Sequence, residues 1–207
     1  FQHWPLARDL DIVTLDATDP WGNGYLIPRG ILREPLRSLS RAGLIVLTKT
    51  DLHGARVDEI KSRLAAVCPN VLIVESIHEP VGLTDLRCEE SRDLSVIKGK
   101  EVCAFSSLGD PQSLRKTLMN LGAFVRENIA LMDHHCYNRD DIARIVQRCR
   151  GNSLSTVVTT EKDAVKLTSL IAFFDQDMEV LSLKINLRIS QKEYEFKNLL
   201  ERAVHLS

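Results

Sequence analysis

The sequence predicts an α/β protein built on parallel β-sheet, and three observations carry that prediction. Short apolar runs typical of buried strands alternate with segments in which apolar residues recur at helical spacing. The connections between them are short, as in right-handed βαβ units. The 207 residues include 44% hydrophobic and 27% charged side chains, which is ordinary for a protein with a buried core. Intrinsic disorder of the whole chain is therefore excluded.

Four elements are predicted in the first half of the chain. Apolar residues recur every three or four positions in residues 57–67, which predicts a helix, and Pro69 follows its end. The run LIVLT at residues 44–48 is almost wholly apolar, as expected of a strand covered on both faces. Shorter runs rich in β-branched residues predict strands at residues 11–15 and 71–74.

The second half repeats the alternation more clearly. Asn138 is the expected cap of one helix, with Asp141 three residues on in the position of a capping-box acid. The last predicted helix is amphipathic, and its apolar residues are Tyr194, Leu199, Leu200 and Val204. The predicted strands cover residues 101–105, 123–131 and 155–159, and the predicted helices cover residues 112–121, the segment after Asn138, a segment holding Lys166 and Leu167, and residues 191–203.

A polar, charge-rich segment at residues 84–99 is the predicted boundary between two parts of the chain. We therefore predict a first α/β domain over residues 1–90 and a second, smaller α/β domain over residues 95–185. A C-terminal helix is predicted over residues 190–207.

Polar residues follow three predicted strands of the second domain, at residues 107–111, 133–138 and 160–163. Loops that follow parallel strands gather at one edge of the sheet, and ligands of open α/β sheets bind at that edge. We therefore expect these three loops to be neighbours and to form a polar ligand site.

Charge, the length of apolar runs and cysteine spacing give no support to several other classes of protein. The chain has 27 Lys and Arg against 28 Asp and Glu, a net charge of −1, so charge gives no reason to expect a nucleic-acid partner. No apolar run approaches the ~20 residues that cross a bilayer. The five cysteines are scattered and form no Cys-x-x-Cys pair, which is typical of thiols in a reducing compartment.

Two polar strings admit both a functional and a structural interpretation. In Asp133-His134-His135-Cys136, a carboxylate beside an imidazole suits general-base chemistry or a metal site, but the same letters suit a solvated turn. Residues 160–163 (TEKD) form either an electrostatic cluster facing a phosphate or a capped helix start, in which Thr160 is the cap. The capping interpretation leaves Lys162 without a role.

Two further features concern nucleotides. Residues 48–51 (TKTD) match the short pattern by which some GTPases hold guanine, although a solvated turn explains the same four letters. No G-x-x-x-x-G-K-[ST] string, which would cradle phosphates, occurs in the 207 residues.

Four strings occur in the order in which one known family carries them. They are Phe-Gln-His at residues 1–3, Ile-Pro-Arg-Gly-Ile-Leu-Arg-Glu at residues 27–34, Asp-His at residues 133–134 and Thr-Glu-Lys-Asp-Ala-Val-Lys at residues 160–166. On these residues the chain resembles the tetraacyldisaccharide 4'-kinases, the lipid A 4'-kinases among the P-loop NTPases. Arg29 and Ile31 depart from the family's usual Ala and Pro, and the following Arg33-Glu34 agrees with it.

The resemblance implies a parallel-sheet, P-loop NTPase-like remnant followed by a second, smaller α/β domain. The family's Walker A loop and Asp-Asp pair precede the position of Phe1. We therefore expect the chain to be a fragment, a processed form or the product of an incomplete gene model.

The resemblance also implies an activity and its residues. The family transfers the γ-phosphate of ATP to the 4' hydroxyl of a tetraacyldisaccharide 1-phosphate in lipid A biosynthesis, with Mg²⁺. His134, supported by Asp133, is then the expected catalytic pair, and Glu34 is expected near the metal. The residues expected to bind substrate or phosphate are Arg33, Gln2, His3, Arg8 and Lys162, with Glu161 and Asp163 at the edge of the site.

The implied partners are a lipid A disaccharide precursor and a membrane surface, with no nucleic acid. The implied location is the cytoplasmic face of the bacterial inner membrane, and a plant mitochondrion is the alternative. Two other functions stay open at this stage: a truncated, non-catalytic isoform or binding module of the same fold, and a GTPase-like protein suggested by residues 48–51.

Overall fold

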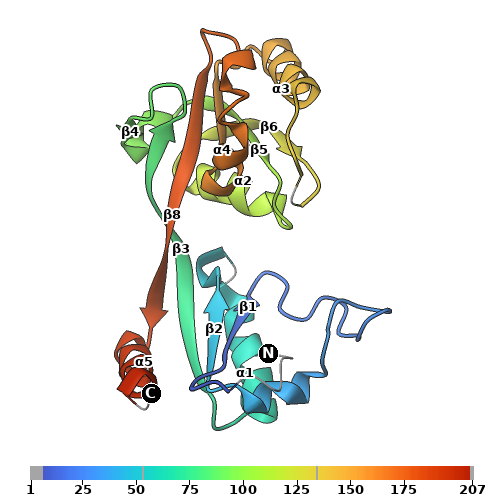
Figure 1. The fold of residues 1–207 in the computed structure, drawn as a ribbon, viewed down its shortest axis with the longest axis vertical. Helices are drawn as coiled ribbons and strands as arrows, with labels where there is room; N and C mark the ends of the chain where they lie inside the picture. The colour runs from blue at the N-terminus through green and yellow to red at the C-terminus, as the bar shows by residue number, and fades with distance from the viewer. Residues whose placement is uncertain (1–6, 53, 134, 206–207) are drawn as a thin grey trace. The chain divides into compact units, whose positions relative to one another are not determined.

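The computed structural model describes residues 7–52, 54–133 and 135–205. The chain forms two compact units, each an α/β structure (Figure 1). The first unit comprises residues Phe1–Glu79 and Leu187–Ser207, and the second comprises Pro80–Asn186. The predicted α/β class with parallel strands is confirmed in both.

The first unit contains three parallel strands in the order β1-β2-β3, together with the end of β8 from Leu187. Its central strand β2 is buried on both faces, as the apolar run at residues 44–48 predicts. Ile45 and Leu47 pack under helix α1, while Leu44 and Val46 pack with Phe196 of helix α5. The elements of this unit are β1 (Ile12–Asp16), η1 (Leu36–Arg41), β2 (Leu44–Thr48), η2 (Thr50–Leu52), α1 (Gly54–Val67), the start of β3 (Leu72–Asp85) and α5 (Glu193–His205).

Helix α5 lies two residues further along the chain than the predicted range 191–203, and its predicted apolar face is partly wrong. Leu199 packs against the sheet of the first unit, as does Phe196. Tyr194 is 75% exposed and Val204 is 71% exposed. Contact with β2 and β3 therefore selects one side of the helix, which the spacing of apolar residues alone did not identify.

The second unit contains four parallel strands in the order β8-β7-β5-β6, and its short strand β4 pairs antiparallel with the end of β3. Phe105 of β5 faces helix α3, where Ile142 and Ile145 complete one apolar core. Leu114 and Leu118 of helix α2 pack against the other face. The elements are β4 (Ser91–Arg92), η3 (Leu94–Ile97), β5 (Glu101–Ser106), α2 (Pro111–Asn120), β6 (Phe124–Ala130), α3 (Arg139–Gly151), β7 (Thr156–Thr160), α4 (Glu161–Leu167), η4 (Ile171–Phe173) and β8 (Glu179–Gln191).

Two long strands, β3 and β8, differ from the sequence prediction. The prediction ended the third strand at residue 74 and placed no strand at 179–191, but β3 continues to Asp85 and β8 has 13 residues. The change from one unit to the other falls inside these strands, whereas the sequence analysis placed it at residues 84–99. That polar segment belongs to the second unit, where it buries Ile97 completely. The helix predicted at 190–207 belongs to the first unit.

Among the residues described, no helix is both long enough and apolar enough to cross a bilayer.

Candidate functional site at the carboxyl ends of the strands

A buried carboxylate ties together two loops at the carboxyl edge of the second unit. Ser107 follows β5, and Asp163 lies in the first turn of α4, just after β7. The Ser107 backbone N–H donates to Asp163 Oδ2 at 2.9 Å, and its hydroxyl donates to Asp163 Oδ1. Thr160 Oγ1 donates to Asp163 Oδ2 at 3.0 Å, and Lys166 Nζ donates to Asp163 Oδ1 at 3.0 Å.

Asp163 is held as a charged carboxylate although it is fully buried. Burial on its own raises the pKa of Asp163, but the hydrogen bonds from Ser107, Lys166 and Thr160 outweigh it and hold the pKa below the usual value. The Lys166 ammonium supplies the compensating positive charge and also donates to Ser107 Oγ at 2.6 Å. A buried carboxylate with a cation and three further donors is fully satisfied, so this cluster fixes the loop positions.

The third loop joins the same edge through Asp133. Lys162 Nζ lies 3.4 Å from Asp133 Oδ1, and about half of each side chain is exposed. Gly109, in the loop after β5, is so close that a Cβ added to it would lie 3.9 Å from Asp133 Oδ2. The predicted meeting of the three loops is therefore confirmed. It also gives Lys162 a partner, which the capping interpretation alone did not.

Helix α3 begins at this edge with the predicted cap. Asn138 Oδ1 accepts from the Asp141 backbone N–H at 3.0 Å, and Asp141 Oδ2 accepts from the Asn138 backbone N–H at 3.0 Å, which completes a capping box. His135 Nε2 lies 2.8 Å from Asp141 Oδ2. Burial raises the pKa of Asp141, but the hydrogen bonds from His135, the Asn138 backbone and Arg144 outweigh it, so that the pKa falls below its usual value.

Tyr137 covers the apolar side of the same loop. Its ring meets Phe105 edge-on with centroids 5.9 Å apart and His135 with centroids 5.5 Å apart. Burial raises the pKa of the Tyr137 phenol far above its usual value, and the charge of Asp163 adds to that effect. Because His135 contacts both Asp141 and the Tyr137 ring, it has a structural role within the string 133–136. The catalytic candidate His134 lies outside the described residues.

A second polar cluster lies at the carboxyl ends of the strands in the first unit. Lys49, just after β2, forms an ion pair with Asp16 at the end of β1, at 2.5 Å. Asp16 Oδ1 also accepts from the Thr18 backbone N–H at 2.9 Å and from its hydroxyl at 2.6 Å. Burial raises the pKa of Asp16, but Lys49 and Thr18 outweigh it and the pKa is lowered. Thr50 donates its hydroxyl to the Ser76 carbonyl at 3.2 Å.

These contacts account for the string at residues 48–51 without a nucleotide, because its lysine binds Asp16 at the end of β1 and its second threonine binds the backbone of β3 at Ser76. Sequence analysis missed the Asp16–Lys49 pair. The two residues are 33 positions apart, and only the alignment of β1 with β2 brings them together.

Of the remaining predicted site residues, Arg8, Arg33 and Glu34 lie in the first unit. Arg8 pairs with Asp11 at 3.2 Å, and Glu34 pairs with Arg41 at 2.5 Å. The hydrogen bond from Arg41 lowers the pKa of Glu34, so this carboxylate is charged. Gln2 and His3 fall outside the described residues.

The described part of the chain has no group of three or more His, Cys, Asp or Glu residues that could hold a metal ion. Mg²⁺, however, is usually bound by one or two carboxylates together with substrate phosphates. Glu34 is a charged, half-buried carboxylate of that kind. It therefore fits the role of a single oxygen ligand.

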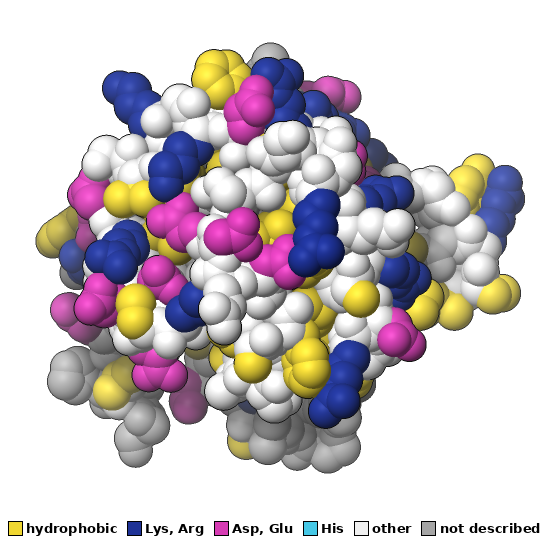
Figure 2. Space-filling view, turned by 90° about the horizontal axis from the view of Figure 1, so that it is seen from above, with side chains coloured by type: hydrophobic (Ala, Val, Ile, Leu, Met, Phe, Trp, Pro, Cys, Tyr) yellow, Lys and Arg dark blue, Asp and Glu magenta, His cyan; other side chains and the backbone are white. Residues whose placement is uncertain are grey.

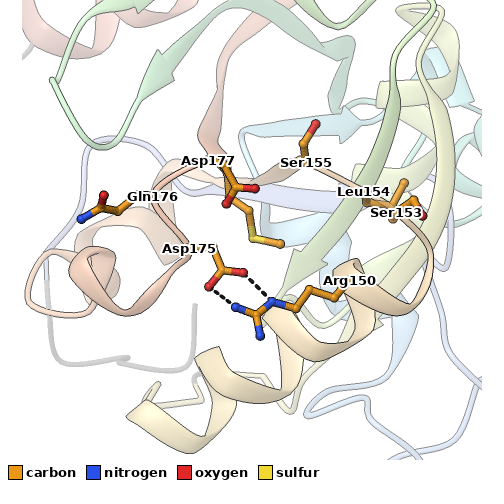
Figure 3. A pocket seen from close by; sticks show the side chains of 8 residues that line it. Arg150, Ser153, Leu154, Ser155, Asp175, Gln176 and Asp177 are labelled. Atoms are coloured by element: carbon orange, nitrogen blue, oxygen red, sulfur yellow. Dashed lines mark hydrogen bonds and ion pairs between the residues drawn. The ribbon is translucent and has the colours of Figure 1, made fainter.

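A cavity of about 520 Å³ lies at the opposite edge of the second unit (Figure 3). Its walls include Arg150 and Asp175, which form two hydrogen bonds of 2.7 and 2.6 Å, and Ser155, which precedes β7. It lies at the amino end of β7, whereas ligands of open α/β sheets bind at the carboxyl ends. We therefore place the candidate site at the loops after the strands.

Parallel α/β sheets whose polar loops gather at the carboxyl edge define the class of ligand-binding α/β proteins. Comparison with known proteins narrows this class. The family model described as tetraacyldisaccharide-1-P 4'-kinase, LpxK, matches residues 1–205. The chain therefore belongs to that family.

Individual relatives agree with the family match. The chain is 37% identical over 202 residues to a tetraacyldisaccharide 4'-kinase of Halothermothrix orenii, with 91% of this chain and 53% of the relative covered. It is 41% identical over 172 residues to the enzyme of that name from Anaeromyxobacter sp. strain K, with 83% and 46% covered. The chain thus spans about half the length of the curated relatives it matches.

A solved structure shows the same fold. The crystal structure titled as the "apo" form of LpxK from Aquifex aeolicus in complex with ATP matches with a TM-score of 0.62 and 27% identity. The match covers 98% of this chain and 55% of that chain. The likeness confirms the predicted fold class, related to the P-loop NTPases.

Proposed function

We propose that this chain works in a lipid A 4'-kinase, which transfers the γ-phosphate of ATP to the 4' hydroxyl of a tetraacyldisaccharide 1-phosphate. The observation that carries the proposal is the family match over residues 1–205, which includes every motif identified in the sequence. The arrangement of three polar loops at one carboxyl edge supports it, because such an edge can orient a substrate and neutralise phosphate charge.

We assign the proton-transfer role to His134 with Asp133 as its support. A sugar hydroxyl has a very high pKa, and a positioned base contributes about 10²–10⁴-fold to its reaction near neutral pH. The Lys162 ammonium lies 3.4 Å from Asp133 Oδ1, so a cation stands beside the carboxylate that is proposed to orient the imidazole. Lys162 is also exposed enough to contact a phosphate.

The other phosphate contacts and the metal contact are assigned to the first unit. Arg33 is exposed, and its planar guanidinium suits bidentate binding of phosphate oxygens. Gln2, His3 and Arg8 are the further proposed contacts. Mg²⁺, when bound with ATP, would neutralise phosphate charge, and Glu34 would supply one oxygen ligand.

The proposed substrate carries acyl chains, so the proposed partner is a membrane surface, and no nucleic acid takes part. The location that fits a bacterial lipid A enzyme is the cytoplasmic face of the inner membrane, and a plant mitochondrion is the alternative.

The test measures transfer of radiolabelled phosphate from ATP to tetraacyldisaccharide 1-phosphate. Because the chain spans only about half the length of its relatives, we would assay it both alone and as a hybrid. In the hybrid, residues 1–205 replace the matching segment of the Halothermothrix orenii relative. Transfer by the hybrid supports the proposal. A folded hybrid that binds the lipid without phosphorylating it would instead support a non-catalytic binding module.

The two adjacent histidines provide a matched pair of variants. In the hybrid, His134→Gln should lower turnover by about 10²–10⁴-fold. His135→Gln should leave turnover within a few-fold of the parent, because His135 binds Asp141 at the start of α3. The reverse result would remove His134 from the mechanism.

A further inference from the structure

Residues 21–33, named here the 21–33 loop, expose an unusual amount of apolar surface. Tyr25, Leu26, Ile27 and Ile31 are 45%, 44%, 59% and 66% exposed. These four large apolar side chains fall within seven residues of sequence. The segment projects from the rest of the first unit in Figure 1. Single exposed apolar residues are ordinary, but a contiguous group marks a surface that binds a protein, a membrane or a ligand.

Hydrogen bonds within the loop give it a defined conformation, in which these side chains are exposed. The Ile27 N–H donates to the Leu32 carbonyl at 2.9 Å, and the Leu32 N–H donates to the Tyr25 carbonyl at 3.2 Å. Asn23 donates its side-chain amide to the Arg29 carbonyl at 2.8 Å. Several backbone groups are thus paired inside the loop, which lowers the cost of placing it in an apolar medium.

Gly30 shows how closely the two sides of the loop approach. A Cβ added at Gly30 would lie 2.1 Å from the Tyr25 carbonyl oxygen and 2.1 Å from Asn23 Oδ1. Only glycine fits there without moving the backbone. Local packing therefore sets the close approach of the two sides of the loop.

The loop is basic as well as apolar. It contains two arginines, Arg29 and Arg33, and no acidic residue, although the whole chain carries a net charge of −1. Both arginines are exposed, and the Arg29 guanidinium lies 3.7 Å from the centre of the Tyr25 ring. Figure 2 shows apolar and basic side chains together on the segment that projects at the right of the view.

We propose that the 21–33 loop docks the protein on an anionic lipid bilayer. The side chains of Leu26, Ile27 and Ile31 enter the boundary between headgroups and acyl chains, and Tyr25 lies at the headgroup level. Arg29 contacts lipid phosphates. Aliphatic and aromatic side chains beside arginines are the composition of segments that bind in the interface of anionic membranes.

This inference rests on the proposed function, because the proposed substrate is itself an acylated phosphate held in a membrane. The loop ends at Arg33 and is followed by Glu34, the residues proposed to contact phosphate and metal. Docking through this loop would therefore bring those residues to the depth of the lipid headgroups. The positive charge of the loop favours an anionic lipid surface over an uncharged one.

The experiment is flotation of the protein with vesicles, in the absence of ATP and of the disaccharide lipid. One vesicle preparation contains phosphatidylcholine with 30% phosphatidylglycerol, and the other contains phosphatidylcholine alone. The double variant Leu26→Ser, Ile27→Ser should partition onto the anionic vesicles at least about tenfold more weakly than the parent. The matched control is Met119→Ser, Phe124→Ser, which removes two side chains of similar exposure from the second unit, 51% and 56%. The control should bind as the parent does.

A second variant tests the charge. Arg29→Gln should weaken binding to the anionic vesicles about fivefold, and it should leave binding to phosphatidylcholine unchanged. Parent-like binding by the Leu26, Ile27 variant, or equal loss in the control, overturns the proposal. So does a protein that binds neither vesicle.

The result is separable from the kinase proposal because binding is measured without turnover. Kinase activity is measured separately on substrate dispersed in detergent micelles. A hybrid that phosphorylates micellar substrate while the loop variant still binds vesicles would overturn the docking surface alone. Vesicle binding that depends on the loop, with no phosphorylation, would overturn the kinase alone.

Discussion

Replacing Asp163 by alanine should loosen the second unit far more than the first. The carboxylate is fully buried and accepts hydrogen bonds from Ser107, Thr160 and Lys166. Breaking a buried charge pair by removing one partner costs about 3–5 kcal/mol. About a quarter of the Lys166 side chain is exposed, so water can solvate part of its charge. We therefore expect the lower limit, about 3 kcal/mol.

Amide hydrogen exchange measures this loss separately in each unit. A loss of about 3 kcal/mol corresponds to exchange about 100-fold faster, since every 1.4 kcal/mol is a factor of ten. We expect this acceleration in peptides from β5 and β7, with β2 of the first unit as the internal reference. Asp140→Ala is the matched control, because Asp140 is an exposed acid in the first turn of α3. It should change exchange by less than about fivefold.

The pH dependence tests the charge itself. The pKa of Asp163 in the folded protein lies below its unfolded value of 3.8, so the folded state binds fewer protons there. The stabilisation by Asp163 is therefore complete well above pH 3.8 and is lost as the pH falls through the pKa of the folded state. In urea titrations, the difference in unfolding free energy between the parent and Asp163→Ala should be constant from pH 7 to about pH 5 and should shrink by pH 3. Equal exchange in Asp163→Ala and Asp140→Ala, or a difference that grows on acidification, would refute the reasoning.

Three further predictions concern single contacts. Asn138→Ala removes the cap of α3 and should cost about 1 kcal/mol in urea unfolding, whereas the exposed Asn120→Ala should cost less. Gly30→Ala should open the 21–33 loop and speed trypsin cleavage there, while Gly151→Ala, which has open space around its Cβ, should not; equal cleavage would contradict the close approach. Burial, aided by the charge of Lys49, lowers the pKa of His78 below 6.5. The unfolded state therefore binds more protons there, and the parent should lose stability relative to His78→Gln as the pH falls below about 6.5. A difference in unfolding free energy that does not change with pH would contradict this.

Most of the fold could be predicted because its strands are buried on both faces. The run at residues 44–48 has neighbours above and below the sheet, so hydrophobicity alone identifies it. β8 was missed although a signal was present, since apolar and polar residues alternate strictly from Leu183 to Ser190. The far half of β3 offered no such signal, because it contains Glu79 and Pro80 and borders the change of unit.

The candidate site was predictable at the level of loops but not of contacts. Parallel strands require that the loops after β5, β6 and β7 meet, and that rule needs no side-chain detail. The bond between Ser107 and Asp163 joins residues 56 positions apart, so it depends on the placement of β5 beside β7. The contact of His135 with Asp141 was within reach of the sequence, because both flank the cap Asn138.

The start of helix α4 shows why two interpretations of residues 160–163 were both needed. Successive residues of a helix point about 100° apart, so neighbours in its first turn face different surroundings. Asp163 faces inward and binds the loop after β5, while Lys162 faces outward and reaches Asp133 after β6. Thr160 caps the helix and also donates to Asp163. This one turn therefore caps helix α4, joins the segments after β5 and β7 through Asp163, and places the Lys162 cation beside the loop after β6. A change at Asp163 should consequently alter the position of Lys162, and with it any activity that depends on Asp133 and His134.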